Sequence, residues 1–92
     1  MTAREVAIRN RLGLHARAAA KFVHAATRFT SQVRVARDDK TMDGKSIMGI
    51  LLLAAGHGAS IVISADGPDE HEAVAALCQL VDNAFGEEPW NG

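Results

Sequence analysis

The sequence has only one cysteine, Cys78, which excludes an internal disulfide. It also lacks a CxxC motif and a neighbouring Cys/His pair, the usual patterns of a zinc site. We therefore expect no metal and no cofactor. A lone thiol suits a reducing compartment, and we expect the protein in the cytoplasm.

The sequence also lacks an excess of either charge and any long apolar run. Its 10 Lys and Arg residues nearly balance 11 Asp and Glu residues, whereas a nucleic-acid binder usually needs a basic excess. The apolar run IMGILLLAAG at 47–56 is far shorter than the ~20 residues of a membrane-spanning helix. The opening MTAREVAIRN has charges at Arg4, Glu5 and Arg9 among its few apolar residues, so it lacks the charged-then-apolar order of a signal peptide. We expect neither nucleic-acid binding nor membrane insertion.

The overall composition is that of an ordinary globular protein. Its 92 residues are 48% hydrophobic and 23% charged, without repeats or low-complexity segments. We expect one domain over 1–92, with a core at about 3–86 and a tail, 87–92, that includes Trp90 and is frayed.

Hydrophobic periodicity predicts seven elements in the order βαββαβα. They are a strand around Val6 and Ile8, a helix over 16–28, strands around 33–35 and 41–42, a helix over 47–55, a strand over 60–65, and a helix over about 69–85. The inward stripes are Ala19, Phe22, Val23 and Ala26 in the first helix and Val74, Leu77, Val81 and Phe85 in the last. This order predicts an α+β two-layer open-faced sandwich, with a four-stranded, mostly antiparallel sheet and three helices on one face.

His15 stands where the helix over 16–28 begins. The first turn of a helix has unpaired backbone N–H groups and a partial positive charge, which together favour anions. Ser, Thr, Asp or Asn usually caps such a start, and histidine is a poor substitute that leaves the donors open. An imidazole there can attack a phosphoryl group, and the dianion formed would face the same donors.

Three neighbours of His15 fit that chemistry. Arg17 offers a permanent cation with forked donors for phosphate oxygens, and phosphoryl transfer needs positioning and charge neutralisation more than acid–base groups. Gly13 suits a tight turn that lets a partner approach, and Leu14 offers it an apolar contact. His15 is thus a candidate phosphoryl acceptor, with Arg17 as its phosphate-stabilising partner.

Simpler interpretations stay open. His15 can be an exposed loop residue at a hydrated helix start. His24 lies about 180° around the helix from it, so the two cannot share a metal. The basic face formed by Arg17, Lys21, His24 and Arg28 is either a solvated surface or a surface that steers an acidic partner, and we include Lys21 among the partner-binding candidates.

The predicted helix over 47–55 has almost no polar face. We assign Ile47, Met48 and Leu51 to a partner surface and Ile50 and Leu53 to the core; a more deeply buried helix is the alternative. Ser46 is predicted to cap this helix. A phosphate on Ser46 would add charge beside the apolar surface and repel partners.

The stretches NRLGLHAR at 10–17 and KSIMGI at 45–50, with their spacing, resemble the HPr family of phosphocarrier proteins of the bacterial phosphotransferase system. The resemblance covers about residues 3–86 in the same βαββαβα order. It implies a protein that accepts a phosphoryl group from phosphorylated enzyme I, which derives it from phosphoenolpyruvate, and passes it to an enzyme IIA.

The resemblance also implies residue roles. His15 falls on the acceptor position, whose Nδ1 carries the group, Arg17 on its phosphate-neutralising partner, and Ser46 on the regulatory site used by HPr kinase/phosphorylase in many bacteria. Ile47, Met48 and Leu51 fall on the docking surface. Ala18 departs from the family pattern, which has proline there, so the helix start should be looser.

The sequence gives other function classes weaker support. A regulatory HPr-like paralogue of the nitrogen-related branch would act mainly through protein binding. A small-molecule-binding domain would need an internal pocket, whereas the branched SIVISA strand at 60–65 indicates a filled core. No second acid or base accompanies His15, so we expect a relay protein rather than a self-contained enzyme. We also expect it to be a monomer.

Overall fold

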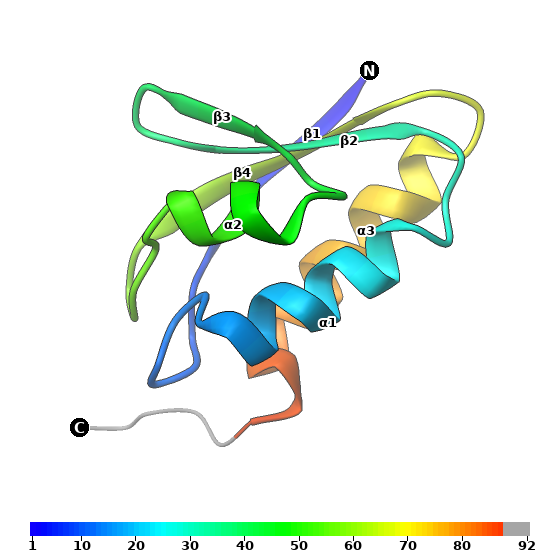
Figure 1. Ribbon diagram of the computed structural model, residues 1–92. Coiled ribbons are helices and arrows are strands. Elements are labelled where there is room, and N and C mark those ends of the chain that lie inside the picture. Colours follow the sequence, from blue (N-terminus) through cyan, green and yellow to red (C-terminus); the bar gives the residue numbers. More distant parts are fainter. Residues whose placement is uncertain (88–92) are drawn as a thin grey trace.

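In residues 1–87, which the computed structural model describes, four strands form one antiparallel sheet and the helices cover one of its faces (Figure 1). The strands are β1 (Thr2–Ala7), β2 (Gln32–Arg37), β3 (Lys40–Asp43) and β4 (Ser60–Asp66); the helices are α1 (Ala16–Ala26), α2 (Ile47–Leu52) and α3 (Glu70–Asp82), followed by the short 3-10 turn η1 (Ala84–Gly86). The strand order is β1-β4-β2-β3. The predicted α+β sandwich is confirmed. Trp90 and the rest of 88–92 lie outside the described residues.

Alternating side chains bury one face of the sheet. Ile61, Ile63 and Ala65 of β4 are buried, as are Val33 and Val35 of β2. Successive side chains of a strand point to opposite faces, and β-branched residues pack well on a pleated surface, so this spacing selects the helix-covered face. β4 lies between β1 and β2, which places the most apolar strand in the interior of the sheet.

Both long helices bury the stripes that the sequence predicts. In α1 the buried set includes Ala19, Phe22, Val23 and Ala26, and in α3 it includes Val74, Leu77 and Val81. Each helix ends a few residues earlier than predicted. Phe85 is buried, but it lies in η1 with a φ of 55°, so a turn rather than α3 carries it into the core. Within residues 1–87, no helix is long and apolar enough to cross a membrane.

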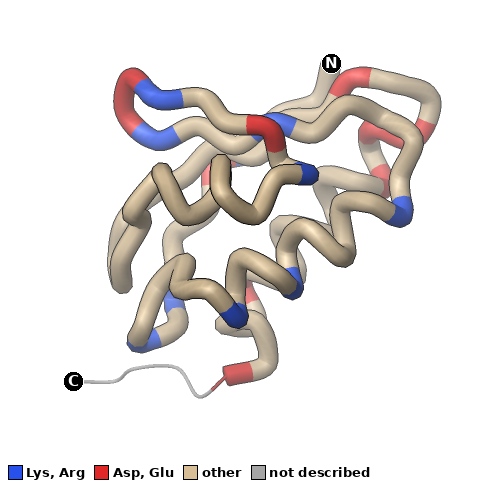
Figure 2. The backbone as a smooth tube through the Cα atoms, in the orientation of Figure 1, with Lys and Arg blue, Asp and Glu red and all other residues tan. Residues whose placement is uncertain are grey.

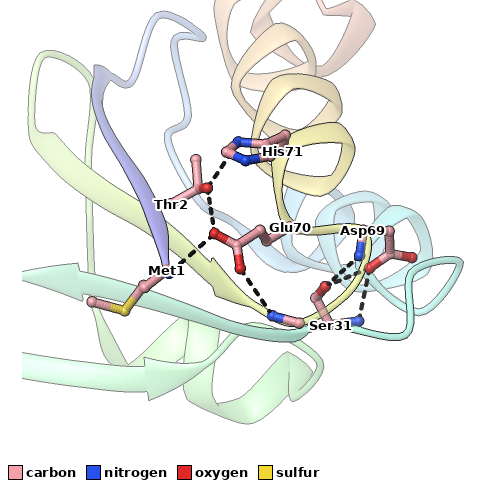
Figure 3. A network of polar contacts seen from close by, with 7 residues as sticks. Met1, Thr2, Ser31, Asp69, Glu70 and His71 are labelled. Carbon is pink, nitrogen blue, oxygen red and sulfur yellow. Dashed lines mark hydrogen bonds and ion pairs between the residues drawn. The ribbon is translucent and has the colours of Figure 1, made fainter.

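A polar network ties the start of α3 to β1 and to the loop before β2 (Figure 3). Asp69 accepts hydrogen bonds from the Ser31 hydroxyl and from the backbone N–H groups of Thr30 and Ser31. Glu70 accepts from Thr2 Oγ1 at 2.6 Å and pairs with the amino terminus of Met1 at 3.1 Å. The Ser31 hydroxyl and the Thr30 N–H lower the pKa of Asp69 to about 2, and the bond from Thr2 does most to lower the pKa of Glu70 to about 2.

These carboxylates predict acid-sensitive stability. A pKa below its unfolded value means that the stabilisation is complete above the unfolded pKa and is lost as pH falls through the folded one. For Asp69 that interval runs from 3.8 down to about 2. Asp69→Asn should therefore be less stable than the unmodified chain near neutral pH, and the difference should shrink across this interval. Chemical denaturation at several pH values measures it.

The exposed Asp39, in the turn between β2 and β3, provides the control. Asp39→Asn removes the same charge without touching the network and should leave the pH profile of stability unchanged. If the two variants had the same pH dependence of stability, Asp69 would not be the source of the acid sensitivity.

Candidate functional site

His15 caps α1 with its own ring. Its backbone is extended (φ −73°, ψ 176°), and Nδ1 accepts a hydrogen bond from the Arg17 N–H at 3.3 Å. The expectation that histidine leaves the helix start open is wrong in this respect. Nδ1 lies as many bonds from Cα as the side-chain oxygen of Asn or Asp, so the imidazole reaches the same donor. The N–H groups of Ala16 and Ala18 have no acceptor within the described part of the chain.

The other ring nitrogen of His15 is held by Glu87, a residue that the sequence analysis missed. Nε2 lies 2.7 Å from Glu87 Oε2, and the two side chains are only 23% and 18% exposed. Burial raises the pKa of Glu87, but hydrogen bonds from Asn10 and His15 outweigh it and hold the pKa below its ordinary value of 4.5. Glu87 is therefore an ionised acceptor for an Nε2–H proton.

Asn10 connects this carboxylate to the loop before α1. Its side chain is fully buried, and Nδ2 donates to Gly13 O at 2.7 Å and to Glu87 Oε1 at 3.1 Å. The predicted frayed tail begins at Glu87, and the structure instead places that residue against the site. No local pattern marks the pairing, because residues 10 and 87 are 77 positions apart.

Arg17 and Lys21 lie on the exposed outer face of α1, as predicted. Figure 2 shows basic positions along α1 and in the loop before it. The Arg17 guanidinium makes no hydrogen bond or ion pair within residues 1–87, so it is available to an anion. Lys21 is engaged, since its Nζ donates to Phe85 O at 2.7 Å and fastens η1 to α1.

The helix α2 carries the candidate docking surface. Ser46 caps it as predicted, with Oγ accepting from the Gly49 N–H at 3.0 Å. Ile50 and Leu53 are buried, as assigned. The exposed apolar side chains, here called the α2 apolar surface, are Ile47, Met48 and Leu52.

Two residues predicted to contact a partner are more buried than expected. Leu51 is half-buried against the core, and its neighbour Leu52 faces outward instead. Leu14 is buried, so it cannot offer a partner the predicted contact; its N–H donates to Ala55 O at 2.9 Å, which draws the side chain inward. Leu12, which the sequence analysis passed over, is 65% exposed in the same loop.

Two of the other histidines, His24 and His71, lie away from this site. His24 is exposed on α1, and His71 Nδ1 lies 3.0 Å from Thr2 Oγ1 in the network at the start of α3 (Figure 3). Among residues 1–87, no three His, Cys, Asp or Glu side chains are grouped to hold a metal ion. The site therefore consists of one imidazole, one carboxylate, an amide, a free guanidinium and backbone donors.

Known proteins resemble this chain over almost its whole length. The family described as "PTS HPr component phosphorylation site" matches residues 2–83. The chain is 51% identical over 87 residues to the phosphocarrier protein HPr of Cupriavidus necator, covering 95% of this chain and 98% of that protein. It is 51% identical over 88 residues to that of Pseudomonas aeruginosa, with coverage of 95% and 98%. A crystal structure of HPr-C-His from Thermoanaerobacter tengcongensis matches with a TM-score of 0.92 at 46% identity, covering 96% and 99%.

Gly13 is the backbone position on which this site depends. Its φ is +67°, and a Cβ there would lie 2.5 Å from Ala55 O and 2.7 Å from Gly56 Cα. Left-handed backbone costs a residue with a side chain about 1–2 kcal/mol, and the overlap adds to this. Gly13→Ala should lower the free energy of unfolding by about 2 kcal/mol or more.

Gly56 is the matched control, because a Cβ there meets nothing within 4 Å. Gly56→Ala should leave stability nearly unchanged in the same denaturation experiment. If Gly13→Ala changes the free energy of unfolding as little as Gly56→Ala does, Gly13 does not approach Ala55 and Gly56 as closely as described.

Proposed function

The chain belongs to the HPr family of phosphocarrier proteins of the phosphotransferase system, and on that basis we propose that His15 Nδ1 is the atom that carries the phosphoryl group. The observation that supports this most directly is the pair of contacts on the ring. Nδ1 accepts from an N–H, and Nε2 faces a carboxylate. The lone pair is therefore on Nδ1, at the mouth of α1.

The surroundings suit a phosphoryl dianion on that nitrogen. The Arg17 N–H that now bonds Nδ1 at 3.3 Å can turn to a phosphate oxygen, and the open N–H groups of Ala16 and Ala18 belong to the same turn. The positive end of the α1 dipole favours the added charge. The Arg17 guanidinium is exposed and free, and we assign it the neutralisation of phosphate oxygens.

We propose phosphorylated enzyme I as donor and an enzyme IIA as acceptor. Both would dock across the mouth of α1 and the α2 apolar surface, with the basic face of α1 steering acidic partners. Ile47 and Met48 are 44% and 66% exposed, which suits this contact. Lys21, on α1, contributes charge from a side chain that its bond to Phe85 O holds against η1.

Phosphorylation tests the acceptor. Incubation with phosphoenolpyruvate and enzyme I should give an acid-labile, base-stable adduct, as expected of a phosphoramidate at a ring nitrogen. His15→Ala should abolish it, because His15 is the only histidine within residues 1–87 whose ring caps a helix. Mass spectrometry and radiolabel transfer measure the adduct.

His71→Ala is the control, since His71 is an exposed histidine in the first turn of α3, outside the site and outside the basic face of α1. It should be phosphorylated like the unmodified chain. A label that persists in His15→Ala would refute the acceptor.

We propose Ser46 as a regulatory phosphorylation site, a substrate for HPr kinase/phosphorylase where that enzyme is present. The hydroxyl is half-buried at the start of α2 and adjoins Ile47 of the α2 apolar surface. A phosphate there adds charge that a docking partner must cover.

Ser46→Asp should slow phosphorylation by enzyme I about tenfold, the equivalent of about 1.4 kcal/mol for covering a new charge on docking. Asp is itself a good helix cap, so the fold should survive. Ser46→Asn is the control, because it also caps the helix and has nearly the same shape without the charge. Equal rates for the two variants in a transfer assay would contradict charge-based regulation.

We further propose that the protein works as a monomer in the cytoplasm and has no turnover of its own. The free, buried Cys78 suits a reducing compartment. A dimer of the T. tengcongensis HPr is among the similar structures, with a TM-score of 0.76, so self-association is the alternative that sedimentation would detect.

A further inference from the structure

The contact between Glu87 and His15 joins two distant parts of the chain through a short, charged hydrogen bond. The Glu87 Oε2 to His15 Nε2 distance is 2.7 Å, and the second carboxylate oxygen takes the Asn10 N–H at 3.1 Å. Each oxygen thus has one donor. Because Asn10 is fully buried and also donates to Gly13 O, the carboxylate is fixed relative to the His15 loop.

The backbone before Glu87 is bent in a way that requires support. Three consecutive residues, Ala84, Phe85 and Gly86, have φ of 54°, 55° and 76°. Non-glycine residues rarely adopt this left-handed conformation. The burial of Phe85 and the bond from Lys21 Nζ to Phe85 O hold the turn in place. Strained backbone that is stabilised in this way is often found at functional sites.

The two contacts on the ring agree on where its proton lies. A backbone N–H can only donate, so Nδ1 must present its lone pair to Arg17. An ionised carboxylate can only accept, so Nε2 must carry the hydrogen. Both partners therefore favour one tautomer, the one whose free lone pair is on Nδ1.

We propose that Glu87 is a positioning residue for phosphoryl transfer: it holds His15 as the Nε2–H tautomer and stabilises the positive charge that the ring gains when Nδ1 attacks. This inference rests on the proposed function of His15. In the step, the Nδ1 lone pair forms the N–P bond while the bond from phosphorus to the donor breaks and its electron pair stays with the donor. The Nε2 proton remains on the ring, which becomes an imidazolium hydrogen-bonded to Glu87. The return step reverses this.

A simple surface ion pair is the competing explanation, since exposed pairs contribute little. The two explanations differ in what happens to the Nε2 proton and to the chemical step. A positioning role fixes the proton in the unphosphorylated protein and changes kcat, whereas an incidental pair changes neither.

The test uses the full chain with Glu87→Ala and Glu87→Gln. Imidazole nitrogen NMR on the 15N-labelled chain should show a slowly exchanging Nε2 proton in the unmodified protein and its loss in Glu87→Ala. Phosphorylation by enzyme I should show a kcat about tenfold lower with KM unchanged, as expected for losing a hydrogen bond to a charged group. Glu87→Gln keeps one acceptor oxygen for two donors. Its kcat should therefore lie between that of Glu87→Ala and that of the unmodified chain.

Glu72→Gln provides the control, because it neutralises an exposed carboxylate on α3 away from the site. A retained Nε2 proton in Glu87→Ala, or a kcat equal to that of Glu72→Gln, would overturn the proposal. If the unmodified chain is not phosphorylated at His15, the proposed function has failed instead, and the proton signal alone then decides whether Glu87 fixes the ring.

Discussion

The structure depends on one local constraint: the first turn of α1 needs hydrogen-bond acceptors, and an imidazole supplies one of them. Because Nδ1 bonds the Arg17 N–H, the ring is oriented by the helix start itself. A serine or aspartate would satisfy the same N–H with a weaker nucleophile or with a negative charge. Histidine combines capping with a nitrogen lone pair, so the atom that caps the helix is also the one that we propose carries the phosphoryl group.

Tertiary structure supplies the partner for the second ring nitrogen of His15, which the helix start does not provide. The order β1-β4-β2-β3 makes β4 the interior strand, and α3 and η1 then return the chain to the mouth of α1. There Glu87 meets His15 and Asn10. The sheet thus fixes where α3 ends, and the polar site brings together side chains from positions 10, 15 and 87.

The sequence predicts the fold well because its signals are periodic and local. The alternation in SIVISA and the stripe through Phe22 each identify a buried face without knowledge of the partner. His15, Arg17 and Ser46 are also recognisable from short motifs. Glu87 is not, because its role comes from a turn of left-handed residues whose conformation tertiary packing imposes. Leu14 and Leu51 show the same limit, since neighbouring leucines compete for burial and only packing decides between them.

The contacts on the two ring nitrogens differ in a way that suits a carrier. The Nε2 contact is 2.7 Å long and involves a charge, whereas the Nδ1 contact is 3.3 Å long and involves a neutral amide. Charge-assisted hydrogen bonds are shorter and stronger than neutral ones. The ring is therefore held firmly at Nε2 and weakly at Nδ1, the nitrogen that we propose reacts. A carrier must release its cargo as readily as it accepts it, and a weak amide contact at Nδ1 is easily exchanged for a phosphate oxygen and easily restored.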